Sequence, residues 1–160
     1  MKKTTMQKYA RLIARKGINV QKNQEVIVNA SLDQPEFVKM VVEECYRAGA
    51  KKVTVEWSYQ PLTKLNYRYR SMKTLSTIEK WEEEKLAHRC DVLPAMIYID
   101  SDDPDGLKGI DQNKVSKASQ ARYPILKPYI DKMENKYQWC IAAVPVSYTH
   151  LRAHETDQYL

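Results

Sequence analysis

Apolar positions along the chain follow two spacings, one typical of helices and one typical of strands. In residues 6–13 apolar side chains recur every three or four positions, which predicts a first helix that ends near Gly17. Residues 25–30 contain three consecutive β-branched side chains between polar flanks, which predicts a strand. Residues 52–57 alternate between apolar and polar types, which predicts a second strand.

A helix is predicted between these two strands. Two apolar rows with i, i+4 spacing define it: Phe37, Val41 and Cys45, and Val38, Val42 and Tyr46. We expect Asp33 to cap this helix, because Pro35 and Glu36 follow as they do in a capping box. We expect Gly49 to end it. A strand, a helix and a strand in this order predict parallel pairing of the two strands.

The second half of the chain continues the alternation. Helical spacing runs through residues 62–90, and residues 92–99 are predicted to form a third strand with Pro94 near its start. Residues 115–133 form a long helical stretch, which Pro124 and Pro128 should break or kink.

Residues 139–144 are predicted to form a fourth strand. They are apolar throughout, as in strands covered on both faces, so we expect Ile141→Ala to cost about 2–5 kcal/mol. Strands that alternate with helices predict an α/β fold, with a mainly parallel sheet of about four strands and helices on both faces.

Composition restricts the class of protein further. The 160 residues are 43% hydrophobic, which suffices for one core without disulfides, and the net charge is +6. The three cysteines form no CxxC pair, so a zinc ribbon or a redox motif is excluded. No apolar run approaches the length of a membrane span, and no secretory signal is recognisable. We therefore expect a cytoplasmic location and no membrane partner.

Two segments suggest metal binding and fail on closer inspection. The acidic run from Asp100 to Gly106 is similar to a calcium loop, but Ser101 and Gln112 occupy ligand positions that need carboxylates. We expect instead a turn after the third strand, where α/β sheets place ligands, so this run can contribute to a cleft. His150 and His154 have the spacing of helical zinc ligands, but no third ligand is recognisable near them.

Two further segments have structural interpretations. His88 and Cys90 form an isolated H-x-C, which fits a helix end. Residues 67–70 mix tyrosine and arginine as single-strand binders do, but on a helix Tyr69 would join an apolar row and Arg68 would face solvent. The residues alone therefore identify no catalytic, cofactor-binding or metal-ligating residue.

Three segments nevertheless carry a resemblance to a known family. Residues 9–20 with the strand after them, residues 48–53 and residues 103–111 resemble, in order and spacing, the aminopeptidase S/aminopeptidase T (PepS-like) family of metallopeptidases. The resemblance covers about residues 1–145, which we interpret as an N-terminal α/β domain. Residues 147–156 instead look like translated adaptor sequence, so we expect 146–160 to be a non-family tail, disordered or artefactual.

The resemblance implies a cytoplasmic hydrolase, a protease that releases N-terminal amino acids from peptides. It also implies a homodimer and two divalent metal ions of the zinc, cobalt or manganese type, which lower the pKa of the attacking water. In the family these ligands belong to the C-terminal domain, so we expect no metal on this chain, and as a truncated fragment it should be inactive. The alternative is a stand-alone α/β module that binds an anionic ligand or single-stranded nucleic acid, although nucleic acid is not an expected partner.

Overall fold

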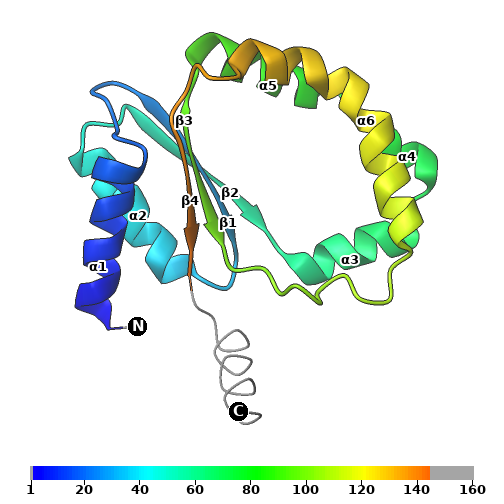
Figure 1. Ribbon diagram of the computed structural model, residues 1–160, viewed down its shortest axis with the longest axis horizontal. Coiled ribbons are helices and arrows are strands. Elements are labelled where there is room, and N and C mark those ends of the chain that lie inside the picture. Colours follow the sequence, from blue (N-terminus) through cyan, green and yellow to red (C-terminus); the bar gives the residue numbers. More distant parts are fainter. Residues whose placement is uncertain (1, 145–160) are drawn as a thin grey trace, which may run out of the picture.

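A four-stranded parallel sheet forms the centre of the molecule (Figure 1). The computed structural model describes residues 2–144; the predicted tail, with His150 and His154, lies outside them. In sheet order the strands are β2 (Lys52–Ser58), β1 (Glu25–Ser31), β3 (Ala95–Asp100) and β4 (Trp139–Ala143). The predicted α/β class with a parallel sheet is confirmed.

Two helices and a π-helical turn cover one face of the sheet. They are α1 (Lys3–Leu12), the turn η1 (Ile13–Gly17) and α2 (Pro35–Arg47). Val28 and Ile97, at the centre of this face, are completely buried against helix residues such as Val41. The predicted row Phe37, Val41 and Cys45 therefore lies in the main core. In the second predicted row Val38 is buried, but Tyr46 is 48% exposed. Gly49 follows this helix at φ +110°, a conformation that glycine adopts without steric cost.

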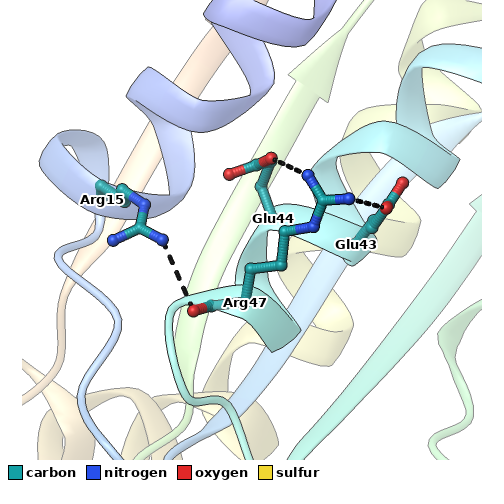
Figure 2. A network of polar contacts seen from close by, with 4 residues as sticks. All are labelled: Arg15, Glu43, Glu44 and Arg47. Atoms are coloured by element: carbon teal, nitrogen blue, oxygen red, sulfur yellow. Dashed lines mark hydrogen bonds and ion pairs between the residues drawn. The ribbon is translucent and has the colours of Figure 1, made fainter.

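The carboxyl ends of α2 and of the π-helical turn are linked at the surface. Figure 2 shows the Arg47 guanidinium between the carboxylates of Glu43 and Glu44, while the guanidinium of Arg15 donates to the Arg47 carbonyl oxygen, 3.5 Å away. Arg47 and Glu43 are mostly exposed, so their ion pair contributes little to stability.

The remaining helices form an arc on the other side of the sheet (Figure 1). They are α3 (Gln60–Tyr69), α4 (Met72–Ser76), α5 (Lys80–Val92) and α6 (Gln112–Met133). On this second face Ile27 and Met96 are almost completely buried. Helices therefore lie on both sides of the sheet. No helix within residues 2–144 combines the length and the apolar character needed to cross a membrane.

The boundary before the third strand differs from the prediction. Val92 is the last residue of α5 and not part of a strand, because Leu93 adopts a left-handed conformation at φ +46° and ends the helix there. The strand begins after Pro94, at Ala95. Apolar residues at a helix end and at a strand start follow one another here, and a periodic pattern cannot separate them.

Pro124 and Pro128 do not break α6, which continues through both residues. They lie four positions apart, so the backbone hydrogen bonds that they cannot donate are lost on one side of the helix. A helix that loses bonds on one side bends without unfolding. The ribbon of α6 is curved in Figure 1.

The prediction that β4 is covered on both faces is wrong. Trp139 and Ile141 are 60% and 62% exposed, whereas Ala142, whose side chain points to the opposite face, is buried. The apolar row predicted on α3 is also exposed, with Tyr69 at 77%. Apolar side chains therefore remain uncovered on the second face at the β4 edge and on α3.

Candidate functional site

A crevice opens at the carboxyl ends of β1 and β3. The chain goes from β1 to β2 on one side and from β3 to β4 on the other, so the strand order changes direction between β1 and β3. The loop after β1 leads to α2 on one face, while the loop after β3 leads to α6 on the other. Loops that diverge from neighbouring parallel strands leave a space at the carboxyl ends, where α/β proteins bind ligands. The cavity measures about 260 Å³, and its lining is Ser31, Leu32, Asp33, Tyr59, Gln60, Pro61, Ser101, Asp102, Asp103 and Gly106.

Hydrogen bonds join the two diverging loops across this crevice. The Ser31 hydroxyl donates to Oδ1 of Asp102 at 2.6 Å, and the Ser101 hydroxyl donates to Oδ1 of Asp33 at 2.8 Å. Asp33 was predicted to cap α2, but Gln34 occupies the cap position and no side chain caps the helix. The carboxylate of Asp33 is instead bonded to the loop after β3, because the crevice brings Ser101 within its reach.

The acidic turn after β3 is fastened to the start of α3 through one side chain. Gln60 donates from Nε2 to the Asp103 carbonyl oxygen at 2.8 Å, and its Oε1 accepts from the Asp103 amide at 3.1 Å. A Cβ atom on Gly106 would lie 2.1 Å from the Gln60 side chain, so glycine leaves the room that this contact needs. The structure thus brings the predicted acidic turn into a cleft.

The crevice supplies hydrogen-bond acceptors but no assembled catalytic group. Within residues 2–144, Asp33, Asp102 and Asp103 form no ion pair with lysine or arginine. His88 lies beside Glu25, at the opposite end of β1 from Ser31, so it cannot act on that hydroxyl. No group of three or more His, Cys, Asp or Glu in the described part of the chain could hold a metal ion. The residues of the described part of the chain therefore do not fit a pair of catalytic metal ions.

A charged network that the sequence reading missed lies on the second face of the sheet. Glu56 of β2 forms ion pairs with both Lys85 and Arg89 of α5. Burial raises the pKa of the Glu56 carboxyl, but the hydrogen bonds and charges of the two cations outweigh burial and hold the pKa below its usual value. The available signals in the sequence were the i, i+4 spacing of Lys85 and Arg89 and the glutamate at a polar position of the alternating strand β2.

The other sequence candidates do not converge on one site. His88 Nε2 is 3.3 Å from Oε2 of Glu25, whereas the Cys90 thiol faces the Tyr129 carbonyl oxygen at 3.5 Å. The H-x-C pair thus has two separate structural partners.

The basic and aromatic segment on α3 has a structural contact of its own. The Lys114 ammonium donates to the Tyr67 carbonyl oxygen at 2.6 Å and ties α6 to α3. Tyr67 and Arg70 line a hollow of about 350 Å³ between α3, α4 and α6. Tyr69 is exposed and does not join a buried row, which corrects the prediction made for it.

Comparisons with known proteins identify the chain's relatives. Aminopeptidase AmpS of Bacillus subtilis is 34% identical over 134 residues, which cover 83% of this chain and 33% of that protein. Aminopeptidase T of Thermus thermophilus is 30% identical over 129 residues, which cover 81% of this chain and 32% of that protein. The solved structure of wild-type AmpT from Thermus thermophilus superposes with a TM-score of 0.79 at 29% identity, and the match covers 90% of this chain and 36% of that one.

The chain therefore spans about a third of the length of the relatives that it matches. Named relatives are aminopeptidases, which does not favour the alternative of a stand-alone binding module. The family model described as thermophilic metalloprotease (M29) matches residues 2–151. Together with the shared fold, this match shows that the chain belongs to the M29 family of metallopeptidases.

Proposed function

We propose that this chain is the N-terminal α/β domain, residues 1–145, of a metal-dependent aminopeptidase that releases N-terminal amino acids from peptides. The observation that carries the proposal is the combination of membership of a metalloprotease family with coverage of about a third of each relative. In the described third, no cluster of side chains suits a metal ion. The metal-binding residues of the enzyme accordingly lie in the rest of the family's chain.

The finer features of the proposal follow from the family resemblance. Two divalent ions of the zinc, cobalt or manganese type would polarise the scissile carbonyl when bound. Peptides are the substrates, and we propose a homodimer in the cytoplasm for the whole enzyme. Residues 146–160 form a separate tail in this proposal. In this proposal the chain by itself is inactive, since residues 2–144 offer no cluster for a metal pair.

A chimaera with a relative tests the proposal. The matched third of aminopeptidase AmpS from Bacillus subtilis is replaced with residues 1–144 of this chain, and amino-acid release from a dipeptide is measured with added zinc, cobalt or manganese. We expect the chimaera to be active, and EDTA to abolish that activity. Intact AmpS prepared in parallel is the control. A folded chimaera without activity, beside active AmpS, would contradict the proposal.

A further inference from the structure

Strand β4 presents an open backbone edge. The Met96 amide donates to the Gln138 carbonyl oxygen and the Val144 amide donates to the Asp100 carbonyl oxygen, so these two bonds mark the ends of the β3–β4 ladder. In a parallel ladder every second residue of a strand bonds to a given neighbour. The residues of β4 that bond to β3 are therefore even-numbered. The amides and carbonyls that point away from β3 belong to Trp139, Ile141 and Ala143.

Little in the described part of the chain covers this edge. Within residues 2–144 the Tyr9 hydroxyl donates to the Ala143 carbonyl oxygen at 3.3 Å, and the Cys140 thiol lies 3.8 Å from the Ile141 carbonyl oxygen. Both partners lie on the α1 side, since Tyr9 comes from α1 and Cys140 packs beneath Gly17. The amides of Trp139 and Ile141 have no acceptor among the described residues.

The two edge strands of the sheet, β2 and β4, differ in whether they carry charged residues. β2, at the other edge, alternates through Lys52, Thr54 and Glu56, and charges of this kind prevent a sheet edge from pairing with another chain. The sequence of β4 is Trp-Cys-Ile-Ala-Ala, without charge, proline or bulge. An apolar edge of this kind would aggregate if it remained free, so natural proteins cover it.

The exposed side chains of β4 extend this edge into a surface. Trp139 and Ile141 point to the second face of the sheet and are more than half exposed. Ile141 also lines a hollow of about 520 Å³, together with Tyr98 and Asn29. A strand placed beside β4 would satisfy the free amides and carry alternate apolar side chains over Trp139 and Ile141.

We propose that the edge of β4 pairs with a further strand, supplied by the part of the family's chain that follows the matched region. The relatives provide the material for such a strand, since about two thirds of AmpS and of AmpT lie outside the region they share with this chain. This inference rests on the proposed function, because it assigns the covering strand to the catalytic part of the same enzyme. The sheet is then the platform that docks that part.

Amide hydrogen exchange tests this pairing. In the 160-residue chain we expect the amides of Trp139, Ile141 and Ala143 to exchange freely, while those of Cys140 and Ala142 are protected. In the AmpS chimaera all five should exchange slowly. Ile141→Lys should restore fast exchange at the edge, whereas Leu12→Lys, at a leucine of α1 that is also more than half exposed, should not. Edge amides that stay fast in the chimaera would overturn the inference.

Other results identify other occupants and also overturn it. Edge protection that rises with the concentration of the 160-residue chain would indicate a second copy, and protection independent of concentration would indicate the chain's own residues. Activity of the chimaera is a separate readout: an active chimaera with fast edge amides refutes the pairing alone, and an inactive one with slow edge amides refutes the function alone.

A second measurement does not depend on the folding of the chimaera. The 160-residue chain and the remaining part of AmpS are coexpressed as two chains and purified through a tag on one of them. We expect a complex that Ile141→Lys weakens at least tenfold and that Leu12→Lys leaves unchanged. Absence of a complex, or equal weakening by both substitutions, would overturn the inference.

Discussion

Gln60 holds the backbone of Asp103 from both sides, with its amide group donating to the carbonyl oxygen at 2.8 Å and accepting from the amide at 3.1 Å. This contact fastens the loop after β3 to the start of α3 and so shapes one wall of the crevice. It depends on Gly106, because a side chain there would occupy the space of the Gln60 amide group.

Gly106→Ala should therefore destabilise the fold by about 1–3 kcal/mol, the net value of the two hydrogen bonds that Gln60 must give up. Urea denaturation measures the change. In a Gln60→Ala background the same substitution should cost much less, since the clash is gone. Gly109→Ala is the control: φ +84° makes it costly, but nothing lies within 4 Å, so its cost should not depend on Gln60. Additive effects of the Gly106 and Gln60 substitutions would contradict the interpretation.

Glu56→Gln should lower the free energy of unfolding by about 1–3 kcal/mol at neutral pH, because the mostly buried guanidinium of Arg89 would lose the negative charge of its partner. The folded pKa of Glu56 lies below the unfolded value of 4.5, so its contribution is present above that value and disappears as the pH falls through the folded pKa. The stability difference between the two proteins should therefore shrink below pH 4.5. Thermal melts across this range measure it.

Glu43→Gln is the matched control for Glu56. The Glu43 side chain is 55% exposed and its partner Arg47 is 61% exposed, so the loss should be within about 0.5 kcal/mol. An equal loss at both positions, or a loss at Glu56 that stays constant down to pH 3, would argue against the network as described.

Ile97→Ala should cost about 2–5 kcal/mol, because Ile97 is completely buried and the substitution leaves a cavity between the sheet and its helices. Ile141→Ala should cost less than about 1 kcal/mol, since Ile141 is 62% exposed and little area is lost from the core. Chemical denaturation of the two variants distinguishes them. A large loss of stability for Ile141→Ala in the 160-residue chain would mean that the second face of the sheet is covered at Ile141, which would contradict the structure.

Cys45 should resist alkylation in the folded chain. It is completely buried, and burial raises the pKa of its thiol to about 12, so almost no thiolate is present at pH 8. Iodoacetamide should react first with the partly exposed Cys90 and Cys140, and mass spectrometry identifies the labelled residue. Labelling of Cys45 at the rate of Cys140 without denaturant would contradict the packing of α2.

The central strands were predictable because their burial is simple. Val26 to Val28 form a short β-branched run, and Val53 and Val55 alternate with polar residues, both of which are typical of strands. The apolar row that begins at Phe37 matches the buried face of α2. The prediction that β4 is covered on both faces was wrong, because an apolar run has the same pattern whether one or both faces of the strand are covered. Its edge position depends on strand order, which no local pattern encodes.

The candidate site was predictable in place but not in detail. An acidic turn after a parallel strand indicates the carboxyl end of the sheet, where the crevice lies. The bonds from Ser31 to Asp102 and from Ser101 to Asp33 join residues about 70 positions apart, and they arise only when strand order brings β1 beside β3. The predicted Asp33 cap does not form for this reason. The Asp33 carboxylate accepts from the distant Ser101 hydroxyl and not from the nearby amides of α2.

Amino-acid release by the 160-residue chain tests most directly whether its described residues contain a catalytic centre. The chain is incubated with a dipeptide and zinc, cobalt or manganese, and the free amino acid is measured against a blank that contains metal alone. We expect no release above the blank, because residues 2–144 hold no cluster that could bind a metal ion. Turnover that disappears on His88→Ala or Asp102→Asn would contradict this and would place catalysis in the α/β domain itself.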